Sequence, residues 1–191
     1  MKTVYLTGAP AAGKSTTAHL LKELVPALKV CEYGAELTRY IAGRHGVSGQ
    51  SDLRRLSGQV VTPEDVAKVD LELLQCVQLN RSTAPIIVDS HPVTKEEYGF
   101  RITAFSHQQI VALDPDEIWV MFTSPLIAVD RIAAAAGGRP MIDLEQARFH
   151  TMLQASVAAT CGIITGKPVY LFDSGIDQHK LVDQLALRLT D

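Results

Sequence analysis

Gly8-Ala9-Pro10-Ala11-Ala12-Gly13-Lys14-Ser15 is the stretch that decides how this chain folds. It matches G-x-x-x-x-G-K-[ST], the pattern of a glycine-rich loop that holds phosphate groups. An apolar, β-branched run at residues 3–7 precedes the loop, and apolar residues at helical spacing follow it. An accidental glycine turn is the alternative, but strand, loop and helix stand here in the order that a phosphate site needs. We therefore predict a nucleotide-binding site.

Such a loop binds phosphate mainly through its backbone. The two glycines allow angles that a β-carbon hinders, so successive amide N–H groups can point into one concavity. The start of the following helix adds unpaired N–H groups and a positive dipole end. We expect Lys14 to reach the β- and γ-phosphates of ATP and the Ser15 hydroxyl to bind Mg²⁺. The residues expected to line the nucleotide are Gly8, Ala9, Pro10, Ala11, Ala12, Gly13, Lys14, Ser15 and Thr16.

The composition is that of one ordinary α/β domain. The chain has 191 residues, of which 47% are apolar and 20% charged, enough for a substantial core. A net charge of −3 argues against a nucleic-acid partner, and no apolar run is long enough to span a membrane. The start of the chain lacks a signal-peptide pattern, and three widely spaced cysteines fit reduced thiols. These features predict a cytoplasmic protein.

Strand-like and helical segments alternate along the chain. The strand-like runs are residues 3–7, 28–31, 85–89, 117–123 and 169–172, and helical patterns begin near residues 16, 62, 144 and 177. In the third of these helices, Phe149, Leu153, Val157 and Cys161 fall on one side. Alternation of this kind predicts a parallel sheet covered by helices on both faces, a three-layer α/β/α fold. The polar, glycine-dotted stretch that starts at residue 33 interrupts the rhythm and is a candidate acceptor-binding insertion.

A second motif, Ile86-Ile87-Val88-Asp89-Ser90-His91-Pro92, is an apolar strand that ends in a carboxylate. In a phosphate-loop protein such an Asp89 orients Mg²⁺ or its waters, whereas in isolation it would be a capping residue in a turn. His91 either contacts the acceptor or is a hydrogen-bonded structural histidine.

These motifs and several others resemble the archaeal type of adenylate kinase over nearly the whole chain. The resemblance rests on GAPAAGKST, VCEYGAEL, SDLRRL, IIVDSHPVTKEEYGF and FHTMLQASVAATCGIITGKPVYLF. It implies a P-loop kinase fold with a five-stranded parallel sheet, an acceptor-binding insertion at residues 33–62 and a lid at residues 131–143, all in one domain, residues 1–191. It also implies Mg·ATP-dependent phosphoryl transfer to AMP, and a homo-oligomer, a trimer by analogy.

Several basic residues are candidates for binding the acceptor. Arg54 and Lys95 match basic positions of the family, where a cation can grip an acceptor phosphate; each can equally be a solvated surface residue. Arg101 either binds a phosphate or caps a helix. The lid of the family is rich in arginine, but DRIAAAAGGRP retains only Arg131 and Arg139 as catalytic candidates. Gly137-Gly138 within it has the character of a hinge.

Besides the arginine-poor lid, the sequence departs from the family at Glu32. The family usually has an uncharged polar residue near this point. A carboxylate repels an incoming phosphate but can accept the proton of a hydroxyl as a general base. The alternative is that Glu32 pairs with Arg39 or another nearby cation. The sequence as a whole favours a nucleoside monophosphate kinase. Two alternatives stay open: a kinase for a hydroxyl of a nucleoside or antibiotic, and a nucleotide-dependent switch without a metabolite acceptor.

Overall fold

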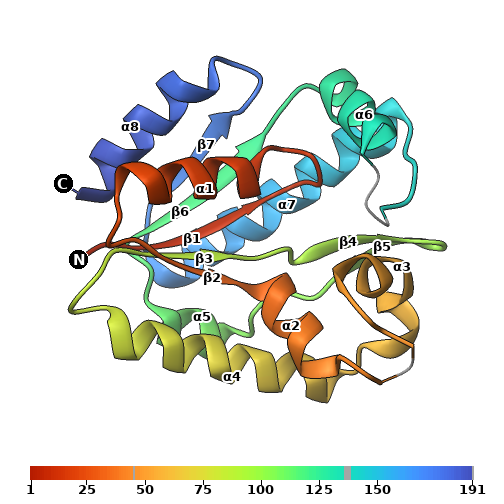
Figure 1. The fold of residues 1–191 in the computed structure, drawn as a ribbon, viewed down its shortest axis with the longest axis horizontal. Coiled ribbons are helices and arrows are strands. Elements are labelled where there is room, and N and C mark those ends of the chain that lie inside the picture. Colours follow the sequence, from red (N-terminus) through yellow and green to blue (C-terminus); the bar gives the residue numbers. More distant parts are fainter. Residues whose placement is uncertain (45, 136–138, 191) are drawn as a thin grey trace.

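The computed structural model describes residues 1–44, 46–135 and 139–190, and its centre is a parallel sheet of five strands (Figure 1). The strands lie in the order β2-β3-β1-β6-β7, with β1 in the middle. Every neighbouring pair is parallel. The predicted three-layer fold with a five-stranded parallel sheet is therefore confirmed. The strands are β1 (Thr3–Gly8), β2 (Lys29–Glu32), β3 (Ile86–Asp89), β6 (Glu117–Phe122) and β7 (Val169–Asp173).

Helices cover both faces because alternate residues of each strand point to opposite sides. Val4 and Leu6 of β1 belong to one apolar cluster, which α1 (Lys14–Leu24) and α8 (Gln178–Thr190) complete. Tyr5, between them, belongs to the other cluster, with α4 (Pro63–Asn80), α5 (His107–Leu113) and α7 (Leu144–Thr165). Two separate cores thus fix the sheet between its helical layers.

The long helices begin where the sequence signals a start. In α4 the Thr62 side chain accepts from the Asp65 N–H, and the Asp65 carboxylate accepts from the Thr62 N–H, with Pro63 at the first helical position. The helix α7 begins with the same kind of reciprocal cap and ends at Gly166, whose φ of 68° is left-handed.

The predicted apolar side of α7 was wrong in part. Phe149 is half exposed, whereas the side facing the core consists of small and polar residues around Cys161. That buried side comprises Ala147, His150, Gln154, Ala158, Cys161 and Gly162. A helix packed tightly against a sheet accepts small residues more easily than large ones, so hydrophobicity alone points to the wrong face.

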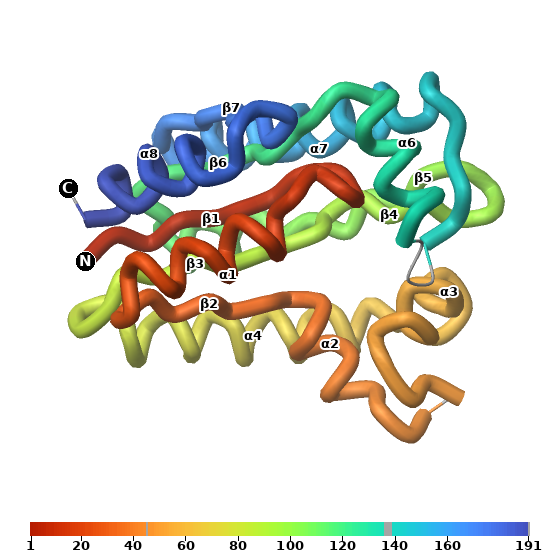
Figure 2. The backbone as a smooth tube through the Cα atoms, turned by 45° about the horizontal axis from the view of Figure 1, so that its top comes forward, coloured from red at the N-terminus to blue at the C-terminus, as the bar shows by residue number. Residues whose placement is uncertain are grey.

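Several elements that the sequence patterns did not predict gather at one end of the molecule (Figure 2). Two helices, α2 (Tyr33–Ile41) and α3 (Gln50–Val60), form the stretch predicted as an insertion. A hairpin of β4 (Val93–Glu96) and β5 (Gly99–Ile102) follows β3, and α6 (Pro125–Ala134) follows β6. The proposed hinge, Gly137-Gly138, lies outside the described residues. Within the described part, no helix has the length and apolar character needed to cross a membrane.

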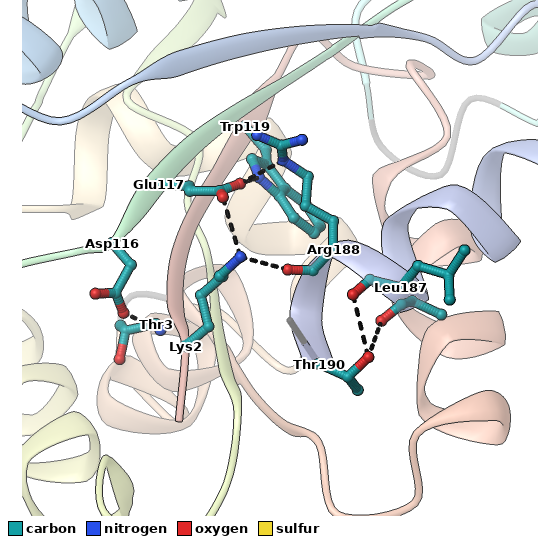
Figure 3. Close-up of polar contacts among 9 residues, drawn as sticks. Lys2, Thr3, Asp116, Glu117, Trp119, Leu187, Arg188 and Thr190 are labelled. Carbon is teal, nitrogen blue, oxygen red and sulfur yellow. Dashed lines mark hydrogen bonds and ion pairs between the residues drawn. The ribbon is translucent and has the colours of Figure 1, made fainter.

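A polar cluster closes the opposite end of the sheet, where the two chain termini lie side by side (Figures 1 and 3). Glu117 at the start of β6 accepts from Lys2 at 3.1 Å, from Arg188 at 2.7 Å and from the Trp119 indole at 2.7 Å. Burial by itself raises the pKa of Glu117, but these three donors outweigh it and hold the pKa below its usual value. The cluster therefore ties both termini to the central sheet.

Glu117→Gln is expected to lower the free energy of unfolding by about 1–3 kcal/mol near neutral pH, because it leaves two partly buried cations without their charge partner. A carboxylate with a depressed folded-state pKa stabilises the protein above its unfolded pKa of about 4.3, and loses this effect as the pH falls further. The difference between wild type and variant should therefore shrink below about pH 4. Urea unfolding at several pH values measures this, with the exposed Glu23→Gln as control; a constant difference would contradict it.

Candidate active site

Three candidate residues lie at the carboxyl ends of adjacent strands. Gly8 ends β1, Glu32 ends β2 and Asp89 ends β3. In the sheet register Asp89 is opposite both Leu6 of β1 and Glu32 of β2. Ligands of open parallel sheets bind outside this edge. The same edge faces α2, α3, the β4–β5 hairpin and α6 (Figures 1 and 2).

The glycine loop has the backbone that the motif requires. Gly8 has φ 151°, and a β-carbon on it would lie 2.2 Å from the carbonyl oxygen of Met121, so no other residue fits. Gly13 has φ 77° and precedes α1 without any side-chain cap. Ala11 also has a positive φ, 61°. The first amides of α1 are therefore left for a ligand, as phosphate binding requires.

Lys14 is buried and curls back onto the loop, donating from Nζ to the Gly8 carbonyl oxygen at 2.8 Å. Burial lowers the pKa of Lys14, the Asp89 carboxylate opposes this shift, and Arg139 and Arg54 add to it. The two following residues, Ser15 and Thr16, are exposed in the first turn of α1. Their hydroxyl groups are accessible to a bound nucleotide or cation.

Asp89 is buried, and its Oδ1 atom has no hydrogen-bond partner among the described residues. Burial raises its pKa to about 6; Lys14 counteracts this and Glu32 reinforces it. A buried carboxylate oxygen without a hydrogen bond is costly. This oxygen therefore suits a cation that the bound substrate brings with it.

Glu32 is exposed at the start of α2 and makes no capping hydrogen bond to that helix. The alternative partner suggested by the sequence, Arg39, instead forms ion pairs with Glu36 and Glu72. Glu32 is close enough to Asp89 to raise its pKa. Two carboxylates thus lie together at this edge, one buried and one accessible.

Arg131 from the end of α6 reaches the glycine loop. It donates to the Ala11 carbonyl oxygen at 2.9 Å and to the Ser174 carbonyl oxygen at 3.3 Å. Arg139, on the far side of the undescribed residues 136–138, donates to the Ala135 carbonyl oxygen at 3.4 Å. The positive charges of Arg54, in α3, and of Arg139 both lower the pKa of Lys14. The insertion and the lid segment therefore each bring a guanidinium toward the loop.

His91 lies in this same positive surrounding. Its Nδ1 is 3.9 Å from Asp89 Oδ1. Partial desolvation and, after it, the charges of Lys14, Arg54 and Arg139 lower its pKa well below the usual value. A neutral imidazole at this place can donate or accept a hydrogen bond, so a role with the acceptor stays a prediction.

Lys95 and Arg101 make their contacts within the hairpin and with α3. Lys95 donates to the Glu96 carbonyl oxygen at 2.7 Å. Arg101 pairs with Glu96 at 3.3 Å and approaches the Ser57 carbonyl oxygen, near the end of α3, at 3.5 Å. The contact of Arg101 matches its helix-capping alternative. For both residues, acceptor binding remains a prediction.

A buried polar chain beneath the site was missed by the sequence reasoning. Thr7 donates to Gln154 Oε1 at 3.0 Å, and Gln154 Nε2 donates to the Val93 carbonyl oxygen at 3.2 Å. His150 Nε2 also lies 3.0 Å from that oxygen. This chain joins the strand before the glycine loop to the segment after His91. Its signal in the sequence was a His and a Gln four residues apart on one side of a largely apolar helix.

Comparisons with known proteins agree with this architecture. The sugar kinase of Janibacter sp. HTCC2649, in unliganded form, matches with a TM-score of 0.60 and 15% identity over 100% of this chain and 95% of its own. The shikimate kinase of Acinetobacter baumannii, in complex with shikimate, matches with a TM-score of 0.61 and 15% identity over 100% and 94%. At this identity the likeness shows the fold. A search of curated protein sequences found no match.

The sequence also matches a protein-family model, the AAA domain, over residues 7–148. This range includes the glycine loop, Glu32, Asp89 and both arginines of the lid segment. The prediction of an ATP-dependent kinase agrees with this family and with the kinase fold of the matching structures. Because residues 7–148 make up well over half of the chain, the chain belongs to the AAA domain family.

Proposed function

We propose that this protein transfers the γ-phosphoryl group of ATP to a hydroxyl group of a small acceptor, with Glu32 as the general base. The observation that supports it most is the position of Glu32, accessible at the end of β2 and directly beside Asp89. Its suggested partner Arg39 is engaged elsewhere. A carboxylate here suits a hydroxyl acceptor, because phosphate acceptors bring negative charge and need no base.

The donor side follows from the glycine loop. The loop amides and the first turn of α1 would hold the phosphates, and Lys14 would leave the Gly8 carbonyl to contact them. Arg131, already against Ala11, would neutralise charge that develops during transfer. Phosphoryl transfer depends mostly on such positioning and charge stabilisation, and these residues supply both.

Residues suited to Mg²⁺ are also present. The unpartnered Oδ1 of buried Asp89 and the exposed Ser15 hydroxyl are oxygen donors of the kind that Mg²⁺ prefers. Among the described residues no three His, Cys, Asp or Glu side chains gather into a group that could hold a metal ion. In kinases Mg²⁺ is held mainly by substrate phosphates and water. When bound, Mg²⁺ neutralises phosphate charge and orients the γ-phosphoryl group.

A pH profile tests this role of Asp89. Because its pKa is raised to about 6, Asp89 takes up a proton as the pH falls through that value and then no longer holds a cation. We expect kcat/KM for Mg·ATP to fall about tenfold per pH unit below pH 6, and this limb to disappear in Asp89→Asn, whose activity is low at every pH. An acid limb near pH 6 that Asp89→Asn retains would contradict the assignment.

On the acceptor side, Glu32 would take the hydroxyl proton while the new O–P bond forms. The bond from the γ-phosphorus to the bridging oxygen breaks at the same time, and ADP leaves with the electron pair. Arg54, Arg139 and His91 lie close to Lys14 and would orient the acceptor. Closure of the lid segment would exclude water and so prevent wasteful hydrolysis of ATP.

A nucleoside monophosphate kinase acting on AMP is the second candidate. Arg54 of the insertion and Arg139 of the lid segment both lower the pKa of Lys14 through their charge. Guanidinium groups bind phosphate well. The resemblance of the sequence to archaeal-type adenylate kinases supports the same function. Glu32 is the feature that this candidate leaves without a role.

One coupled assay separates the possibilities. ADP formation from Mg·ATP is followed with sugars, hydroxy acids, nucleosides, aminoglycoside antibiotics and each nucleoside monophosphate. Turnover with a hydroxyl compound supports our proposal, and turnover with AMP or another monophosphate alone replaces it with the second candidate. ATP hydrolysis with no acceptor, stimulated only by another macromolecule, would instead indicate a nucleotide-dependent switch.

A further inference from the structure

Two cysteines that are far apart in the sequence meet beside β2. Cys31 lies in β2 and Cys76 in α4, and their Sγ atoms are 2.8 Å apart. The residues are separated by 45 positions, and both thiols are free. The third cysteine, Cys161 of α7, is also free and buried. Neither the sequence pattern nor the proposed phosphoryl transfer uses the pair.

We propose that Cys31 and Cys76 form a reversible disulfide that clamps the edge strand β2 to α4. A disulfide has an S–S length of about 2.05 Å, so closing the present gap needs a movement of less than about 1 Å. The two residues also pack in the same apolar cluster, so the cross-link requires no rearrangement of the core. Cys31 immediately precedes Glu32, so the clamp lies next to the acceptor end of the sheet.

The strand order explains why a clamp at this place matters. The strand β2 lies at an edge of the sheet and, among the described residues, pairs only with β3, so its other side lacks a neighbouring strand there. The intervening chain includes α2 and α3, the whole predicted insertion. A cross-link between Cys31 and Cys76 therefore closes this insertion into a covalent loop. Such a loop restricts the unfolded chain and stabilises the folded one.

The oxidant would be a low-molecular-weight disulfide such as oxidised glutathione. Cys76 is the more accessible of the two and attacks first, forming a mixed disulfide and releasing one small thiol. Burial raises the pKa of Cys31, so its thiolate forms rarely and the second step is the slower one. When Cys31 loses its proton and attacks the Cys76 sulfur, the second small thiol leaves and the disulfide is complete.

The experiment incubates the native protein with oxidised glutathione and counts free thiols under denaturing conditions by mass spectrometry after alkylation. We expect the count to fall from three to one, with Cys161 as the remaining thiol and a Cys31–Cys76 cross-linked peptide. Dithiothreitol should restore all three. A glutathione adduct that persists on Cys76, or three thiols that stay free, would overturn the proposal.

Thermal unfolding tests the clamp itself. Oxidation should raise the midpoint by about 5–10 °C in the wild type and in Cys161→Ser, and reduction should reverse the change. Cys31→Ser and Cys76→Ser should show no such rise. A cross-link that forms without raising the midpoint would rule out a clamp. Because none of these measurements involves ATP or an acceptor, the result is independent of the proposed phosphoryl transfer.

Discussion

Lys14→Met is expected to reduce kcat/KM for phosphoryl transfer by at least about a thousandfold, the largest effect of any single substitution. Lys14 is the buried cation of the glycine loop. It donates a hydrogen bond to the Gly8 carbonyl oxygen, and the Asp89 carboxylate raises its pKa. Methionine keeps most of the aliphatic stem but removes the charge that neutralises the transferring phosphates. Steady-state kinetics with saturating acceptor measures the loss, and calorimetry of Mg·ATP binding shows how much of it arises in the ground state.

Lys22→Met is the matched control for this experiment. Lys22 lies on the same helix, is exposed and is remote from the glycine loop. It should retain the kinetics of the wild type. A thermal-unfolding midpoint close to that of the wild type would show that Lys14→Met still folds. If folded Lys14→Met bound and turned over Mg·ATP normally, no nucleotide site would remain at the loop, and the proposed function would be wrong.

Glu32→Gln is expected to slow transfer to a hydroxyl acceptor by about 10²–10⁴-fold, the usual contribution of a general base. Affinity for Mg·ATP should change little, because Glu32 lies at the end of β2, outside the glycine loop. The amide keeps the size of the side chain but cannot take the hydroxyl proton. The loss should therefore appear in kcat and not in nucleotide binding.

Glu36→Gln controls for the loss of a negative charge nearby, since Glu36 lies in α2 and pairs with Arg39. It should leave kcat unchanged. The two candidate functions predict opposite effects of Glu32→Gln on turnover. For a monophosphate acceptor, the substitution removes a repulsion and should preserve or increase turnover. Unchanged transfer to a hydroxyl compound would exclude Glu32 as the base.

The site was predictable to different degrees. The glycine loop and Asp89 were located from the sequence because each is a short motif at the end of a single strand, and such a motif is visible as a local pattern. The insertion was recognised as an interruption, but its helices were not, because α3 is polar and its buried residues are few. The lid segment was located through its arginines; the contact of Arg131 with Ala11 and Ser174 joins three distant segments and has no local signal.

The buried residues of α7 were the least predictable. The sequence pattern pointed to Phe149, but the buried side holds Ala158, which packs in the core beneath the sheet, and Ala147, which packs in a separate cluster with α6, together with Gln154. Which side of a helix is buried depends on how closely it can approach its neighbour, and small side chains allow the closest approach. Gln154 can be buried there only because Thr7 and the Val93 carbonyl satisfy its amide.

By itself, the sequence determined the glycine loop, the alternation of strands and helices and hence the parallel three-layer fold. These follow from spacing along the chain, since backbone angles and hydrophobic periodicity are local properties. Only the tertiary structure decided that Glu32 lies beside Asp89 and that Cys31 meets Cys76. The physical reason is that strand order and helix packing are set by the burial of two whole cores, which no local pattern specifies.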